Sequence, residues 1–279
     1  MWAMALAIFI GCKWLTLRKA CRNSPKPSHK RSLAYLFLWP GLNAAEFLGL
    51  KQSPQNRASV LECTSSVAEL RRADGSAPPL SILAGLKLCL GALLLATAAK
   101  EVTHWHPLIV GWVAMFGIVL VLHFGIFELL SIAWQRAGIN AQPLMRAPLR
   151  SRSLAEFWGK RWNTAFSNLA HEFAFRPLSR RFGPSVATMV VFAISGLIHE
   201  AVISLPARAG YGLPTAYFLL QGLGLLLERS SWGRHAGLGS GLHGRCFAVL
   251  FSLIPAFALF HFFFIHHVIL PMLQFIGQH

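Results

Sequence analysis

Long apolar runs alternate with polar and basic segments along this chain. The longest runs cover 80–99, 107–134 and 185–205. Each reaches the ~20 residues that an α-helix needs to cross the hydrocarbon core of a bilayer. None of them alternates apolar and polar residues as the strands of a membrane barrel do. The pattern therefore predicts an all-α, multi-pass integral membrane protein.

Shorter or interrupted apolar runs add to this predicted helical bundle. Further membrane helices are expected at 2–17, 213–227 and 246–276. The last of these contains Pro255 and Pro271 and should be kinked. Another run, 32–50, is broken at Pro40 and suits a re-entrant element. We expect about six to eight spanning or re-entrant helices in a single membrane-embedded domain over residues 1–279.

A net charge of +16 is concentrated between the apolar runs. The basic segments are 18–31, 136–184 and 229–245. The positive-inside rule places all three on the cytoplasmic side, which makes 136–184 a large basic cytoplasmic loop. Three apolar runs separate the first two segments, and three crossings would put those segments on opposite sides of the membrane. One run should therefore not cross, and we assign this role to 32–50. The alternative is that one basic segment is an exception to the rule. Topology and lipid headgroups account for most of the charge, and no motif indicates a nucleic-acid partner.

The composition excludes several classes of protein. The chain is 54% hydrophobic and 13% charged, whereas a soluble domain carries about 25% charged residues. The five cysteines include no CxxC pair, which indicates neither a zinc site nor a disulfide framework. We expect no metal and no resident cofactor. The apolar N-terminus lacks a basic leader and a small-residue cleavage site, so it is interpreted as a membrane helix and not a signal peptide.

One histidine lies near the inner end of an apolar run, where an ionisable group is costly and by default marks a functional site. This residue is His199, followed by Glu200. On a helix, Ser195 and Gly196 share its face and could line a narrow polar track. Glu200 points about 100° away, so it is expected to pair with an arginine or to orient a neighbouring helix. Burial disfavours the imidazolium, so a neutral ring could act as a general base; the alternative is a structural histidine bonded between helices.

An aromatic and basic motif lies upstream, over residues 157–163. On a regular helix, Trp158 and Trp162 would stack four residues apart, as would Glu156 and Lys160. Tryptophan beside lysine and arginine is typical of a segment in the lipid headgroup zone. Asn163 fits that interpretation poorly, because an amide gains nothing from an apolar environment unless it has a partner.

Together the two motifs, SLAEFWGKRWN at 153–163 and SGLIHE at 195–200, resemble the wax synthase-like branch of the membrane-bound O-acyltransferase superfamily. The resemblance places the core motif block at 150–205. It implies transfer of a fatty acyl group from acyl-CoA to the hydroxyl of a lipophilic alcohol, which gives a wax or related ester. It also implies that His199 is the catalytic histidine and Asn163 the second signature residue, which could position the acyl donor or donate a hydrogen bond to the oxyanion.

The expected partners are acyl-CoA as co-substrate, a lipophilic alcohol and membrane lipids, in the endoplasmic reticulum or a bacterial inner membrane. The residues expected to contact substrate are Trp158, Trp162, Lys160, Arg161, Ser195 and Gly196. Lys160 and Arg161 would hold the phosphates of CoA, for which arginine forks are well suited.

Three rival hypotheses start from other features. A transporter could use His199 and Glu200 as a proton relay, although no repeat of the kind common in transporters is present. The histidines at 261, 266 and 267 raise the possibility of a di-iron enzyme, but they form no His-x-x-x-His box. A catalytically inactive scaffold is disfavoured by the presence of both Asn163 and His199. His123 and Glu128 are expected to bond between helices, with pocket lining as the alternative.

Overall fold

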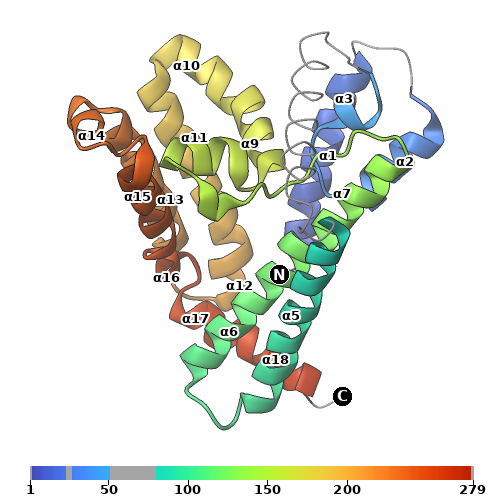
Figure 1. Cartoon of the computed structure of the whole chain (residues 1–279), viewed down its shortest axis with the longest axis vertical. Helices are drawn as coiled ribbons and strands as arrows, with labels where there is room; N and C mark the ends of the chain where they lie inside the picture. The colour runs from blue at the N-terminus through green and yellow to red at the C-terminus, as the bar shows by residue number, and fades with distance from the viewer. Residues whose placement is uncertain (1, 23–26, 51–79, 278–279) are drawn as a thin grey trace, which may run out of the picture.

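Every regular element in the described part of the chain, residues 2–22, 27–50 and 80–277, is helical in the computed structural model (Figure 1). The predicted polar loop 51–79, with Cys63, lies outside the described residues. Among the described residues, four helices are long and apolar enough to cross a membrane: Leu80–Glu101, Pro107–Arg136, Pro184–Ala207 and Gly241–Leu259. The structure therefore agrees with a multi-pass membrane helical protein.

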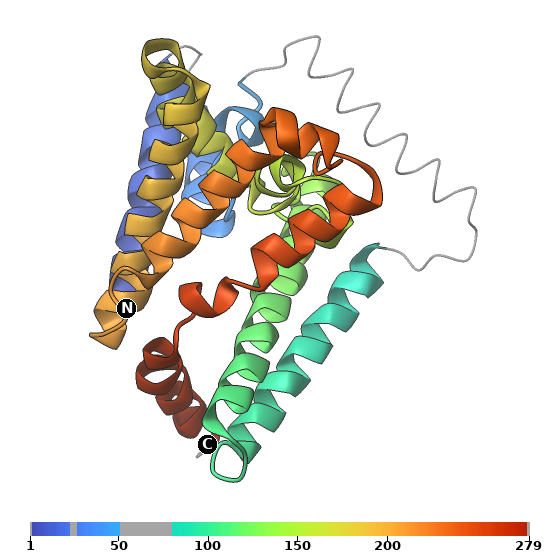
Figure 2. The ribbon, with the colours of Figure 1, turned by 90° about the vertical axis from the view of Figure 1, so that its left-hand side faces the viewer.

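Two groups of helices are visible in Figure 1. The first group holds α2 (His29–Leu38), α3 (Ala44–Phe47), α5 (Leu80–Glu101), α6 (Pro107–Val119), η1 (Leu120–Ile126) and α7 (Phe127–Arg136). The helix α1 (Trp2–Arg22) contacts α2 and α3 on one side and residues 200–204 of the second group on another, away from α5 (Figure 2). The elements α6, η1 and α7 are one continuous helix with a π-helical middle, and α5 packs along it (Figure 2). Glycines allow that approach, since a Cβ on Gly91 would lie 2.8 Å from the carbonyl oxygen of Gly117.

The second group contains both motifs. Its helices are η2 (Pro148–Arg150), α8 (Leu154–Glu156), η3 (Phe157–Arg161), α9 (Thr164–Ala170), η4 (His171–Phe175), α10 (Arg176–Phe182), α11 (Pro184–His199), η5 (Glu200–Ser204), α12 (Leu205–Ala207), α13 (Leu213–Arg229), α14 (Ser231–His235), α15 (Gly241–Leu253) and α16 (Ala256–Leu259). The basic segment between the second and third candidate spans is thus mostly helical. Its polar composition reflects exposed helix faces and not a lack of regular structure.

The run at 32–50 is broken at Pro40, as predicted, and forms two short helices, whereas its re-entrant path stays a prediction. Ten residues of α2 rise about 15 Å, half the thickness of the hydrocarbon core. The helix ends just before Pro40, and its carbonyl groups need other donors. Lys13 of α1 is one such donor, since its buried Nζ donates to the carbonyl oxygen of Tyr35 in α2 at 2.7 Å. The same Nζ also donates to the carbonyl oxygen of Gly41, beyond the helix, at 2.6 Å. Lys13 and three further basic residues also explain why α1 is not among the four candidate spans.

The last apolar run is divided where the sequence predicted one kinked helix. Pro255 cannot donate a hydrogen bond to the carbonyl of Phe251, so α15 ends and α16 starts beyond it. Gln221 of α13 bonds that carbonyl instead, at 2.9 Å. A second apolar helix follows, made of α17 (Phe262–Phe264), η6 (Ile265–Ile269) and α18 (Leu270–Gly277). It contacts α5 and α6, so it links the two groups of helices.

Two hydrophobic clusters hold the described helices together. The main core joins α5, α6, α11, α13, α15 and the C-terminal helix, and Trp158 packs against it. The second cluster lies between α2, α3 and residues 141–165, with Tyr35 and Phe47 at its centre. The helix α13 belongs to the main core and contacts α11 along its length, which places it behind His199.

Candidate active site

His199 is the last residue of α11, and a π-helical turn begins at the next residue. Its Nδ1 lies 2.7 Å from the carbonyl oxygen of Ser195. A carbonyl can only accept, so in the neutral ring Nδ1 carries the proton and Nε2 keeps its lone pair. Within the described residues no hydrogen bond reaches Nε2. The half-buried ring therefore presents a basic nitrogen that the protein itself does not use.

The imidazole is held by an aromatic neighbour from α13. The ring centroids of His199 and Phe218 are 4.4 Å apart. Phe218 is buried, and it also contacts Phe192 and Trp158 at centroid distances of 6.5 Å and 5.8 Å. The histidine is thus fixed on one side by its own helix and on another by a packed ring.

The small residues one turn before His199 have packing roles. The hydroxyl of Ser195 donates to the carbonyl of Val191 at 3.0 Å and is buried. A Cβ on Gly196 would lie 2.7 Å from the Cα of Thr215, so this glycine permits close contact between α11 and α13. Thr215 occupies the space beside Gly196. A contact of Ser195 or Gly196 with substrate stays a prediction.

Glu200 orients a neighbouring helix, one of the two roles that its position predicted. Its Oε1 accepts hydrogen bonds from the backbone N–H of Gly212 at 2.9 Å, and from the N–H and hydroxyl of Thr215 at 3.1 Å and 2.9 Å. These N–H groups at the start of α13 have no partners within the helix, and a carboxylate is favoured there by the helix dipole. No hydrogen bond joins Glu200 to His199 in the described structure.

The aromatic motif folds as a π-helical turn, and this changes which side chains meet. The N–H of Trp162 donates to the carbonyl of Phe157, five residues earlier, at 2.8 Å. The predicted stack of Trp158 on Trp162 is absent from the described structure because the wider turn separates them. Phe157 lies between the two, 5.1 Å from Trp158 and 5.7 Å from Trp162.

Trp158 packs inside the bundle, against α11 and α13. Its indole N–H donates to Oε1 of Gln221 on α13 at 3.1 Å. Its ring packs against Phe192 and Phe218, with centroids 5.8 Å away in each case. The tryptophan is therefore one ring away from His199, with Phe218 between them.

Asn163 combines a structural role with an unused donor. Its backbone is left-handed, with φ 43° and ψ 59°, a conformation that asparagine tolerates better than most residues. Its Oδ1 accepts from the N–H of Phe166 at 3.3 Å and caps α9. In the part of the chain that the structure describes, its Nδ2 has no hydrogen-bond partner. No hydrogen bond or ring contact joins Asn163 to His199 there.

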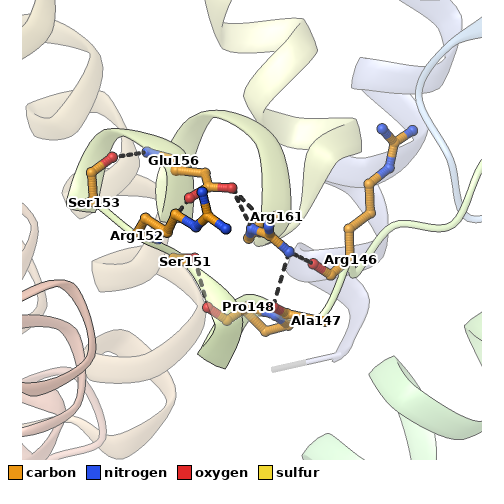
Figure 3. A network of polar contacts seen from close by, with 8 residues as sticks. All are labelled: Arg146, Ala147, Pro148, Ser151, Arg152, Ser153, Glu156 and Arg161. Atoms are coloured by element: carbon orange, nitrogen blue, oxygen red, sulfur yellow. Dashed lines mark hydrogen bonds and ion pairs between the residues drawn. The ribbon is translucent and has the colours of Figure 1, made fainter. Parts of the chain in front are cut away.

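Arg161 bonds to Glu156 and to the backbone of the loop before the motif (Figure 3). Its guanidinium pairs with Glu156 at 2.7 Å and donates to the carbonyls of Arg146 and Ala147 at 3.0 Å and 3.4 Å. Partial burial by itself would raise the pKa of the Glu156 carboxyl. Hydrogen bonds from the Arg152 N–H and from Arg161 outweigh this effect, so the pKa of Glu156 is lowered overall. The π-turn explains why Glu156 meets Arg161 and not Lys160, which is exposed. Phosphate binding by Lys160 or Arg161 stays a prediction.

Two further residues bear on the site. His123, in η1, stacks on Trp162 with centroids 6.0 Å apart, and its buried Nδ1 has no hydrogen-bond partner among the described residues. The sequence suggested that His123 and Glu128 bond between helices or line a pocket. His123 makes a ring contact instead, whereas Glu128 does bond between helices, to Lys87 of α5 at 2.7 Å. Glu228 was not singled out, yet it accepts hydrogen bonds from the N–H groups of Leu154 and Ala155. Nothing in the local sequence links residues so far apart.

The clustered histidines near the C-terminus have separate roles. His261 bonds Ser204 and caps α17, and His267 lies 2.8 Å from the carbonyl of Ala207. His266 packs on Phe262. Among the described residues no group of three histidine, cysteine, aspartate or glutamate side chains is arranged to hold a metal ion.

Comparison with known proteins agrees with the resemblance inferred from the two motifs. A sequence model of the membrane bound O-acyl transferase family matches residues 141–220, a range that includes Asn163, His199 and Phe218. The chain is 30% identical over 106 residues to the long-chain-alcohol O-fatty-acyltransferase of Simmondsia chinensis, which covers 35% of this chain and 30% of the relative.

Two Arabidopsis thaliana proteins are similar to the chain over comparable regions. Probable long-chain-alcohol O-fatty-acyltransferase 9 is 32% identical over 73 residues, covering 23% of this chain and 21% of the relative. Probable long-chain-alcohol O-fatty-acyltransferase 8 is 25% identical over 132 residues, covering 44% and 39%. The matched regions thus span between about a fifth and two fifths of the lengths of these relatives.

Proposed function

We propose that this membrane protein is an O-acyltransferase that moves a fatty acyl group from acyl-CoA to the hydroxyl of a lipophilic alcohol and forms a wax or related ester. The observation that carries the proposal is the state of His199. Its Nδ1 proton is fixed by the Ser195 carbonyl at 2.7 Å, which leaves Nε2 as a free base. The family match over 141–220 and the printed names of the relatives support acyl transfer as the reaction.

The chemistry follows from that nitrogen. Nε2 takes the proton of the alcohol as its oxygen attacks the thioester carbonyl. When the tetrahedral intermediate collapses, the carbon–sulfur bond breaks and the imidazolium returns the proton to the leaving thiolate, so the products are an ester and the free thiol of CoA. General base catalysis of this kind contributes about 10²–10⁴-fold to the rate.

Asn163 is proposed to act on the acyl donor. Its Oδ1 is used to cap α9, but both N–H bonds of its Nδ2 remain available within the described structure. An amide donor can bind the thioester carbonyl, or the oxyanion that forms from it. Asn163 and His199 are 36 positions apart in the sequence, and Trp158 and Phe218 lie between their segments and would hold the two groups at a fixed separation.

The structure gives no support to a proton relay in a transporter. The carboxylate of Glu200 is held by three donors of α13 and does not bond His199. An acyl-transfer site needs only the histidine of this pair, with the glutamate in a supporting role.

The test uses membranes that contain the protein, labelled palmitoyl-CoA and a panel of fatty alcohols, sterols and glycerides. We expect a labelled ester with at least one alcohol. The product should fall to background in His199→Ala and persist in His171→Ala, whose exposed histidine lies on η4. Failure to form an ester with any acceptor, or full activity of His199→Ala, would refute the proposal.

A further inference from the structure

A second buried carboxylate connects the two motifs through helix α13. Glu228 is 5% exposed and lies near the C-terminal end of this helix. Its Oε2 accepts from the N–H of Leu154 at 2.5 Å, and its Oε1 accepts from the N–H of Ala155 at 3.2 Å. Both N–H groups belong to the first turn of α8 and have no partner within that helix. A carboxylate in this position is favoured by charge-assisted hydrogen bonds and by the helix dipole.

The third N–H of the same turn is satisfied locally. Ser153 accepts from the N–H of Glu156 at 3.0 Å, as its place before an acidic residue would suggest. The first two N–H groups therefore depend on a residue more than seventy positions away in the sequence. The turn that they begin continues into η3, which carries Trp158 and ends at Arg161, two residues before Asn163.

The opposite end of α13 is bound to the His199 motif. Glu200 holds its first turn through Gly212 and Thr215, and Phe218 packs on the imidazole. In the middle of the helix, Gln221 accepts from the indole of Trp158. Thus α13 is fixed to one motif at its start and to the other motif at its middle and end.

We propose that Glu228 is a positioning residue for the acyl transfer: by capping α8 from α13, it holds the segment that carries Trp158 and Asn163 in register with His199. The stretch of α13 from Thr215 to Glu228 is about 20 Å long. Glu228 therefore acts through the helix and does not touch the reacting atoms at His199. A misplacement of about 1 Å at a reacting group can reduce a rate about 100-fold. This inference rests on the proposed function.

The decisive comparison is between Glu228→Gln, Glu228→Asp and the wild type, purified in detergent and assayed with palmitoyl-CoA and the accepted alcohol. Gln keeps one acceptor oxygen but turns an amide N–H₂ toward a second donor, so one cap bond is lost. Asp keeps the charge, but its side chain is one methylene shorter, so the carboxylate lies farther from the N–H groups of α8. We expect kcat, per folded molecule measured by size-exclusion chromatography, to fall about tenfold or more in Glu228→Gln and less in Glu228→Asp. KM for the alcohol should change less than twofold.

Glu172→Gln is the matched control, because Glu172 is an exposed carboxylate on η4 that pairs with Lys19 at 2.5 Å. It should leave kcat and KM unchanged. If Glu228→Gln does not accumulate as folded protein, a lowered kcat in folded Glu228→Asp supports the inference. A kcat equal to that of the wild type in every folded Glu228 variant would overturn it. A wild type that makes no ester would instead refute the proposed function.

Discussion

Two histidines at helix ends, His199 as the last residue of α11 and His261 as the cap of α17, use their nitrogens in opposite ways. His261 is 2% exposed; its Nδ1 accepts from the N–H of Phe264 at 3.2 Å, and its Nε2 lies 3.3 Å from the Ser204 hydroxyl. In the neutral ring the proton must then be on Nε2, and both nitrogens are used. His199 uses only Nδ1, for the carbonyl of Ser195, and its Nε2 is left free.

This difference separates a structural histidine from a candidate base. Burial and a place in an apolar run are common to both residues, so neither property identifies the site. What distinguishes His199 is an unused lone pair. The same criterion places Asn163 with His199, since its Oδ1 caps a helix while its Nδ2 stays unused in the described structure.

Asn163→Asp should give the largest separation between activity and stability. Aspartate keeps the oxygen that caps α9 and tolerates the left-handed backbone, but it has no N–H to donate. We expect ester formation to fall about 10²–10³-fold, as when an oxyanion donor is removed, with a thermal midpoint equal to or slightly above that of the wild type. If the variant remains fully active, the role of Asn163 is structural only.

His261→Ala should show the reverse behaviour. The change removes the side-chain cap of α17 and the bond to the Ser204 hydroxyl, while the N–H of Phe264 keeps the backbone carbonyl of residue 261 as an acceptor at 2.9 Å. Loss of the cap and of a buried hydrogen bond together cost about 1–3 kcal/mol. We expect a lower thermal midpoint in detergent but an activity per folded molecule within about threefold of the wild type. Loss of activity at unchanged stability would contradict the structural role assigned to His261.

Gly196→Ala examines how closely α13 must approach α11, the helix that carries His199. The new Cβ would lie 2.7 Å from the Cα of Thr215, a backbone atom that cannot rotate away. We expect a loss of about 1–3 kcal/mol in unfolding free energy, as for other overpacked sites, with a partial loss of activity. Gly159→Ala is the control, because a Cβ there meets nothing within 4 Å. Equal thermal midpoints for the two variants would show that the contact is not tight.

The sequence predicted the elements that depend on local composition. Three candidate spans lie within a few residues of the apolar runs at 80–99, 107–134 and 185–205 because those runs are long and unbroken. The break of the run 32–50 at Pro40 was also predicted, since proline interrupts a helix in a known way. The family was predicted from two motifs whose residues could be recognised without a structure.

Features that depend on distant contacts or on a change of helical period were not predictable. The π-turn at 157–161 places Glu156 against Arg161, whereas a regular helix would place it against Lys160. The tautomer of His199 depends on the rotation of its ring toward Ser195. The cap formed by Glu228 depends on the packing of α13 against α8. Each follows from tertiary packing, which the pattern of apolar positions does not encode.

The most direct test of the free lone pair is the variant His199→Asn. The asparagine amide takes the place of Nδ1 and can still donate to the Ser195 carbonyl, while the atom that corresponds to Nε2 is absent. We predict that ester formation falls about 10²–10⁴-fold while the thermal midpoint stays close to that of the wild type. An activity within a few-fold of the wild type would show that Nε2 is not the base.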